Sequence, residues 1–140
     1  MNWEAILLAG GKLEDEFKPL GSFSGKAYLP IEGKPMAQYV LNSLLSVPSI
    51  KRVVCVLPEG GSEFPGTIST AGGKTLVESL GKGISALLSE TNLVLVAACD
   101  LPFLTKKGIE NFMTQCEQSD AGLFLVRIQN LDFQEPGILM

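Results

Sequence analysis

Histidine is absent from the 140-residue chain. Its absence removes from consideration the usual general base of enzymes and the usual zinc ligand. The three cysteines, Cys55, Cys99 and Cys116, are far apart in the sequence and form no CxxC pair. Because Cys55 and Cys99 lie inside apolar runs, we expect them to be buried free thiols in a reducing cytosol.

Long hydrophobic runs and an excess of positive charge are also missing. The apolar run near the N-terminus has no basic residue before it and is too short for a signal peptide or a membrane span. The net charge of −4 argues against broad nucleic-acid binding, which depends on a basic surface. We therefore expect a cytoplasmic protein whose partners include neither a membrane nor a nucleic acid.

The composition, with 46% hydrophobic and 19% charged residues, fits a single globular domain over residues 1–140. Continuous apolar runs predict buried strands, and apolar residues spaced by three and four predict amphipathic helices. The expected strands or extended segments are residues 5–9, 27–31, 52–57, 93–98 and 121–126, and the expected helices are residues 36–47, 75–89 and 106–118. Their alternation predicts an α/β fold, a three-layer α/β/α Rossmann-like arrangement with a mainly parallel sheet.

Two segments between these elements carry additional predictions. Residues 62–73 are expected to form a loop, with a short extended piece at 67–68. Gly81 and Gly83 lie inside the second expected helix and weaken it locally. They indicate either close packing or the close approach of a ligand.

Ligands of open parallel sheets bind beyond the carboxyl ends of the strands. In this chain that rule selects three places: Gly10-Gly11 after the first strand, residues 58–61 after the second, and Asp100 after the third apolar strand. Two of the three carry residues suited to phosphate or to a metal ion.

Glycine and lysine follow the first strand in a way that suits a phosphate. Gly10 and Gly11 let a ligand approach the main chain, and the loop after them carries Lys12, Lys18 and Lys26. Lys26 is the best candidate for a phosphate contact because its ammonium offers three donors. An ordinary β-turn followed by a surface loop explains the glycine pair equally simply, because short glycine motifs occur often by chance.

Asp100 and Ser79 are the other candidate site residues. The Asp100 carboxylate is a hard oxygen ligand that suits Mg²⁺, but it could instead cap the turn that follows it. Ser79 could bind a base or a ribose, although a serine in a helix often has no such role.

Three blocks of residues occur in the order, and on the secondary-structure elements, that are typical of one superfamily. The first block is Leu8-Ala9-Gly10-Gly11 with Lys26, Leu29-Pro30-Ile31 and Gly33-Lys34-Pro35-Met36. The second is Gly72-Gly73 with Ser79 and Gly83-Ile84, and the third runs from Ala98 through Asp100 to Thr105. Together they resemble the GT-A, or nucleotide-diphospho-sugar transferase, superfamily of nucleotidyltransferases, and most of all its molybdenum-cofactor guanylyl- and cytidylyltransferases.

The resemblance implies a reaction and a set of roles. An acceptor phosphate would attack the α-phosphate of a nucleoside triphosphate and release pyrophosphate, with Mg²⁺ as the cofactor. Lys26 would stabilise the transferring phosphate, Asp100 would hold the metal, and the remaining nucleotide contacts would come from Leu8, Ala9, Gly10, Gly11, Lys12, Lys18, Gly73 and Ser79. The guanylyltransferase members imply GTP as a donor and molybdenum-cofactor biosynthesis as the setting.

The sequence departs from the superfamily pattern at three points. Glu16 stands where the superfamily loop carries an arginine that contacts the triphosphate, and Leu76 stands where the cytidylyltransferase branch has an arginine. Because of Leu76, no base preference is carried over from the cytidylyltransferase branch. Members also continue beyond the fourth strand into an acceptor-binding portion, so we expect a C-terminally shortened form of the fold.

Two other interpretations follow from these departures and from the glycine pattern. The chain could be a catalytically incomplete nucleotide-binding or assembly module, and an exposed sheet edge would favour a homodimer. An NAD-type Rossmann enzyme is disfavoured because no GxGxxG motif follows the first strand.

Overall fold

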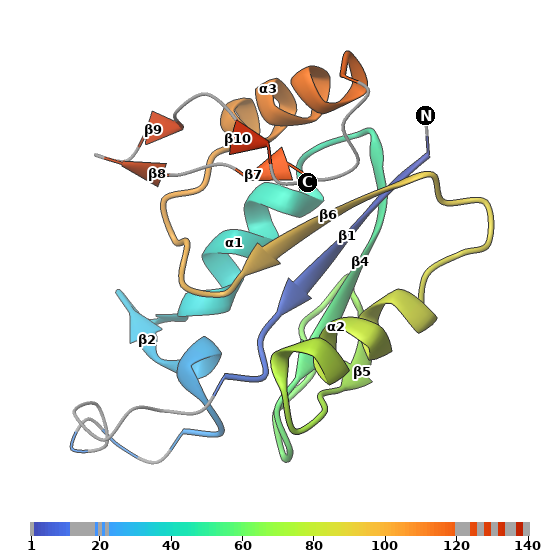
Figure 1. Ribbon diagram of the computed structural model, residues 1–140. Helices are drawn as coiled ribbons and strands as arrows, with labels where there is room; N and C mark the ends of the chain where they lie inside the picture. Colours follow the sequence, from blue (N-terminus) through green and yellow to red (C-terminus); the bar gives the residue numbers. More distant parts are fainter. Residues whose placement is uncertain are drawn as a thin grey trace.

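The computed structural model describes residues 2–11, 19, 21 and 23–119, together with the backbone of four two-residue strands after residue 123 (Figure 1). Its main sheet has the strand order β5-β4-β1-β6, and every neighbouring pair is parallel. These strands are β1 (Trp3–Leu8), β4 (Ile50–Leu57), β5 (Ile68–Ala71) and β6 (Leu93–Ala98). The predicted parallel α/β sheet is confirmed.

Three helices and three small two-stranded ribbons complete the described part of the chain. The helices are α1 (Met36–Leu45), α2 (Leu76–Ser85) and α3 (Lys106–Glu117), and the 3₁₀ turn η2 (Lys26–Tyr28) precedes them. The ribbons pair β2 (Pro30–Ile31) with β3 (Lys34–Pro35), β7 (Phe124–Leu125) with β10 (Gly137–Ile138), and β8 (Ile128–Gln129) with β9 (Asp132–Phe133).

The sheet separates two apolar cores because side chains alternate between its faces. On one face, Leu7 of β1 belongs to the same core as Leu41 of α1 and Ile109 of α3. On the other face, Ile6 and Val56 form a smaller core against α2. Helices therefore cover both faces of the sheet, as the three-layer prediction requires.

Most element bounds agree with the sequence predictions to within a few residues, and two segments differ in kind. Residues 27–31 are not one extended segment, because Lys26–Tyr28 form a 3₁₀ turn and only Pro30–Ile31 is a strand. Residues 68–71 form the edge strand β5, where mostly loop was expected. Its side chains are half-buried or exposed, so its sequence lacks the apolar run of a central strand.

The expected strand at residues 121–126 is described only at Phe124–Leu125. These two residues pair antiparallel with Gly137–Ile138 and do not belong to the main sheet. The rest of that segment lies outside the described residues.

Helix α2 is shorter than predicted, and α2 and α3 each begin at a threonine that caps the helix. The Thr105 hydroxyl accepts a hydrogen bond from the Gly108 N–H at 3.1 Å, and Thr75 does the same for Glu78 at 3.1 Å. Such caps satisfy backbone donors that a helix leaves without partners. The last turn of the predicted second helix, residues 86–89, is outside α2.

The uncovered margin of the sheet lies along β6. Val94 is 36% exposed and Val96 is 45% exposed. Both lie on the face of the sheet on which α2 covers the neighbouring strands β1 and β4. Self-association through this margin stays a prediction. Within the described part of the chain, no helix has the length and apolar character needed to cross a membrane.

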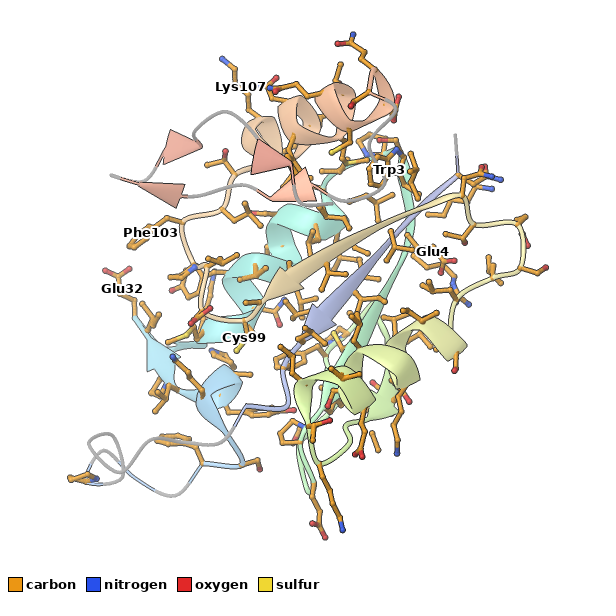
Figure 2. The ribbon with its side chains drawn as sticks, viewed as in Figure 1. Trp3, Glu4, Glu32, Cys99, Phe103 and Lys107 are labelled. Atoms are coloured by element: carbon orange, nitrogen blue, oxygen red, sulfur yellow. The ribbon has the colours of Figure 1, made fainter. Side chains whose placement is uncertain are left out.

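A buried carboxylate fastens the amino end of the sheet. Glu4 has no exposed surface, and its side chain points from β1 toward the chain between α2 and β6 (Figure 2). It accepts hydrogen bonds from Arg52 Nε at 2.7 Å and from the Leu88 N–H at 2.8 Å, and the Thr91 hydroxyl also donates to it. Arg52 in turn donates to the Ala86 carbonyl at 2.6 Å. One side chain therefore links β1, β4 and the segment after α2.

These contacts determine how Glu4 ionises. Burial by itself would raise the pKa of Glu4, but the hydrogen bonds from Thr91, Arg52 and Leu88 and the charge of Arg52 outweigh it and hold the pKa below its ordinary value. A depressed carboxylate pKa stabilises the folded state above the unfolded-state pKa, about 4.3. That stabilisation is lost as the pH falls through the folded-state pKa.

We expect Glu4→Gln to lower the free energy of unfolding at pH 7 by about 2–3 kcal/mol, because it replaces an anion among three donors. The loss should shrink as the pH falls below about 4.3, where the carboxylate of the unfolded chain becomes protonated, and should vanish once the pH is below the lower folded-state pKa. Urea unfolding between pH 3 and 7 measures both effects. Glu63→Gln, at an exposed glutamate, is the control and should change stability by no more than about 0.5 kcal/mol. An equal loss at all pH values would contradict the role given to the Glu4 charge.

The two glycines inside α2 differ in their surroundings. A Cβ atom at Gly83 would lie 2.9 Å from Ile6 Cγ2 and 3.2 Å from Val56 Cγ2, whereas a Cβ atom at Gly81 would meet nothing within 4 Å. Gly83 therefore brings α2 close to the sheet. Of the two alternatives left by the sequence, close packing is confirmed for Gly83.

The pair gives a matched test of this packing. Gly81→Ala should stabilise the protein by up to about 1 kcal/mol, because alanine is the better helix former. Gly83→Ala makes the same intrinsic gain but forces α2 away from Ile6, at a cost of about 1–3 kcal/mol. We expect the first variant to raise the melting temperature and the second to lower it. Two increases would show that α2 can move away from the sheet at little cost.

Candidate functional site

The order of the strands concentrates the candidate residues at one edge of the sheet. From β1 the chain proceeds to β4 and β5 on one side and then returns to β6 on the other side (Figure 1). This change of direction between β1 and β6 opens a crevice at their carboxyl ends. Gly10 and Gly11 follow β1, and Asp100 follows β6 with only Cys99 between them.

Lys26 and Asp100 meet at this edge although 74 residues separate them in the sequence. Lys26 Nζ lies 3.3 Å from Asp100 Oδ2, and their side chains are 26% and 47% exposed. Lys26 opens the η2 turn, and Asp100 lies in the turn just after β6. The structure thus brings together the cation and the anion that the sequence selected, at a place that solvent reaches.

Gly10 and Gly11 lie beside this ion pair, and the fold does not require glycine at either position. The Ala9 N–H donates to the Val56 carbonyl at 2.9 Å, which fixes the backbone just after Leu8. A Cβ atom at Gly10 would make only ordinary contacts, and one at Gly11 would meet nothing within 4 Å. Neither glycine has the positive φ that side chains avoid. Among the described residues, none crowds the space beside this backbone.

Gly25 is a further residue of this edge that the sequence predictions missed. A Cβ atom at Gly25 would lie 2.6 Å from the Gly11 carbonyl oxygen, and the Lys26 N–H donates to that same oxygen at 3.3 Å. The φ of Gly25 is 172°, an extended value, so the requirement for glycine is steric. A glycine directly before the candidate lysine was the signal in the sequence.

Gly73 and Ser79 are brought together in a structural contact. Ser79 Oγ accepts a hydrogen bond from the Gly73 N–H at 3.0 Å, and a Cβ atom at Gly73 would lie 2.4 Å from Glu78 Cβ. These contacts fold the segment between β5 and α2. The nucleotide roles given to Gly73 and Ser79 stay predictions, and Lys12 and Lys18 lie outside the described residues.

Among the described residues at this edge, Asp100 is the carboxylate that lies beside Lys26 and could bind a metal ion. The described residues contain no group of three or more histidine, cysteine or acidic side chains that could hold a metal. Cys99, labelled beyond the end of β6 in Figure 2, is only 6% exposed. Burial, with a further contribution from the Asp100 charge, raises the pKa of its thiol despite the opposing charge of Lys26. A protonated buried thiol is a poor metal ligand, which leaves Asp100.

Comparison with known proteins identifies the family. A family model described as the MobA-like NTP transferase domain matches residues 5–137. The chain belongs to this family. The resemblance to the nucleotide-diphospho-sugar transferase superfamily is therefore confirmed.

Two curated relatives illustrate the similarity, and both are named 2-C-methyl-D-erythritol 4-phosphate cytidylyltransferase. The protein of Nitrosospira multiformis is 30% identical over 118 residues, which are 74% of this chain and 51% of that protein. The protein of Thermotoga neapolitana is 30% identical over 134 residues, 88% of this chain and 58% of that protein. The MobA-like chain thus spans only about half the length of the curated relatives it matches.

Solved structures share the fold. A hypothetical transferase from Thermus thermophilus is 27% identical with a TM-score of 0.70, and the match covers 90% of this chain and 50% of that one. A 2-C-methyl-D-erythritol 4-phosphate cytidylyltransferase, also from Thermus thermophilus, has a TM-score of 0.66 at 18% identity, over 98% of this chain and 63% of that one. The second likeness concerns the fold alone.

The solvent exposure of the Lys26–Asp100 pair predicts that the ion pair contributes little to the stability of the fold. Because both side chains reach solvent, their coupling in a double-mutant cycle of Lys26→Met and Asp100→Asn should be below about 1 kcal/mol. Urea unfolding of the four proteins measures it. The same cycle for Glu4 and Arg52 is the control and should give a larger coupling, because the Glu4 carboxylate is fully buried although Arg52 is 28% exposed. A coupling above about 2 kcal/mol for the exposed pair would mean that it holds the fold together.

Proposed function

We propose that this chain forms the nucleotide- and metal-binding part of a nucleotidyltransferase. In the proposed reaction, a phosphate oxygen of the acceptor attacks the α-phosphorus of a nucleoside triphosphate. The bond from that phosphorus to the oxygen bridging to the β-phosphate breaks, and pyrophosphate leaves with its electron pair. The observation that carries the proposal is the pairing of Lys26 with Asp100 beside the open Gly10-Gly11 backbone.

Charge explains why such an arrangement suits a nucleoside triphosphate bound to a cation. In the absence of ligand, Lys26 and Asp100 neutralise each other at 3.3 Å. A metal–triphosphate complex carries a cation for Asp100 and phosphate oxygens for Lys26, so both charges keep a partner when the ion pair opens. Since an exposed pair contributes little stability, its opening costs little.

Mg²⁺ fits the available donors, and we propose it as the cofactor with Asp100 as its protein ligand. Mg²⁺ keeps several waters and commonly binds through one or two carboxylates together with substrate phosphates. When bound, it would neutralise the charge that develops on the transferring phosphate. Lys26 would stabilise the same charge from the protein side, and the backbone at Gly10 and Gly11 would lie against the nucleotide.

CTP is the donor that we propose, because the curated relatives described above are named cytidylyltransferases. These relatives give no support to GTP or to molybdenum-cofactor biosynthesis. Their names also make a phosphorylated polyol the first acceptor to test. The positive charge of Lys26, the cation described at this site, is compatible with a phosphorylated acceptor of this class.

The proposal predicts that CTP binds only together with a divalent cation and raises the melting temperature of the protein. At a free CTP concentration of about 100 times Kd, the stabilisation would be about 2.7 kcal/mol. Thermal unfolding with CTP, GTP, ATP or UTP, each with and without Mg²⁺, measures this. Gly11→Ala should fold as stably as the wild type, since its methyl group meets open space, but should bind CTP at least about tenfold more weakly.

Gly81→Ala is the matched control for this variant, because it also adds a methyl group in open space but on the exposed side of α2. It should leave CTP binding unchanged. Normal CTP binding by Gly11→Ala would remove the glycine pair from the site. Binding of CTP without pyrophosphate release, in the presence of a phosphorylated polyol, would favour the alternative of a nucleotide-binding module that does not carry out transfer.

A further inference from the structure

We propose that Gly25 and Tyr28 are positioning residues that hold Lys26 at the site from both ends of the η2 turn. This inference rests on the proposed function, because that function gives Lys26 its role at the site. The contacts that carry it lie on the loops after β1 and β4. It gives a role to the loop at residues 58–64, of which the sequence placed residues 58–61 at the ligand-binding edge without identifying any chemistry there.

The first contact fixes the beginning of η2. The backbones of Gly25 and Gly11 touch, because a Cβ atom at Gly25 would lie only 2.6 Å from the Gly11 carbonyl oxygen. The Lys26 N–H donates to that oxygen at 3.3 Å. Since the atom in the way belongs to the backbone, any side chain at residue 25 must push the Lys26 segment away from the glycine pair.

The second contact fixes the end of η2. Tyr28 Oη donates to the Ser62 carbonyl at 2.6 Å, and its ring stacks on Phe64 with the ring centroids 5.2 Å apart. Phe64 is buried in the main core, so this end is anchored to the body of the protein. Burial raises the pKa of the Tyr28 phenol, which therefore remains a donor at neutral pH.

The loop after β4 closes around this anchor. A Cβ atom at Gly61 would lie 2.5 Å from Tyr28 Oη, and the Ser24 hydroxyl donates to the Gly60 carbonyl at 3.2 Å. Gly60 has a φ of +74°, which favours glycine and allows the turn that brings Gly61 to the tyrosine. The glycines at residues 60 and 61 thus serve the turn that carries Lys26.

The three-residue length of η2 explains why both contacts matter. Lys26 is the first residue of the turn and Tyr28 is the last, so the two anchors lie only two residues apart and restrict the lysine backbone from both sides. A long lysine side chain reaches many positions, and fixing its backbone restricts them to those near Asp100 and the glycine pair. A displacement of about 1 Å at such a group can cost up to about 100-fold in rate.

The nucleotide-independent experiment measures amide hydrogen exchange at Lys26 in the full chain. We expect Gly25→Ala to speed exchange of the Lys26 amide at least about tenfold, because the hydrogen bond to Gly11 is lost. Gly81→Ala should leave it unchanged. An unaltered Lys26 amide in Gly25→Ala would overturn the inference, whether or not the protein binds nucleotides.

The second experiment measures CTP binding with Mg²⁺ by NMR titration into the millimolar range. Gly25→Ala should weaken binding about tenfold or more, and Tyr28→Phe, which keeps the ring but loses one hydrogen bond, about two- to tenfold. Tyr39→Phe is the control for the tyrosine, since Tyr39 Oη donates to the Ile31 carbonyl at the same distance of 2.6 Å. It should have no effect on binding.

A Lys26→Ala background separates positioning from general damage to the site. If Gly25 acts through Lys26, adding Gly25→Ala to Lys26→Ala causes no further loss of affinity. A further tenfold loss, or full affinity in Gly25→Ala alone, would overturn the inference while leaving the proposed function intact. Failure of the wild-type protein to bind any nucleotide would instead overturn the proposed function, and the exchange experiment would then decide the role of Gly25.

Discussion

The pairing of β1 with both β4 and β6 is the constraint on which the rest of the structure depends. Because β1 is parallel to both neighbours, all three strands end at one edge, and segments far apart in the sequence meet there. Glu4 fastens the opposite end of β1, where Arg52 and the segment after α2 converge on its carboxylate. The sheet therefore has a rigid end held by a buried charge and an open end that carries the candidate site.

The open end of the sheet, at the carboxyl ends of the strands, is built mainly from backbone contacts. Gly25 touches Gly11, the Ala9 N–H is held by Val56, and the loop at residues 58–64 closes on Tyr28. Of the candidate site residues that the structure describes, Lys26 and Asp100 carry the charge. A site of this kind suits a reaction in which the protein mainly positions phosphates and stabilises charge, and such a reaction does not need the histidine that the chain lacks.

The sequence was sufficient for much of this architecture, and its failures have physical causes. The central strands β1 and β4 are visible as apolar runs because both of their faces lie in the protein, whereas the edge strand β5 has no such run and is expected from the sequence to be mostly loop. The prediction of residues 27 and 28 as extended is wrong, because they belong to the 3₁₀ turn Lys26–Tyr28 and three residues show no periodicity. Gly25 was missed because its requirement comes from Gly11, which lies fourteen positions earlier in the sequence.

By itself, the sequence determined the class of fold, the order of strands and helices, and the chemistry at the strand ends, because these depend on local periodicity and residue type. It could not determine whether the glycines in α2 serve packing or a ligand, nor whether Lys26 and Asp100 meet. Only the tertiary structure decided that Gly83 packs on Ile6, that Gly11 faces open space, and that the two charges lie 3.3 Å apart. The reason is that steric contact and ion pairing depend on distances in space, which a sequence of residues does not contain.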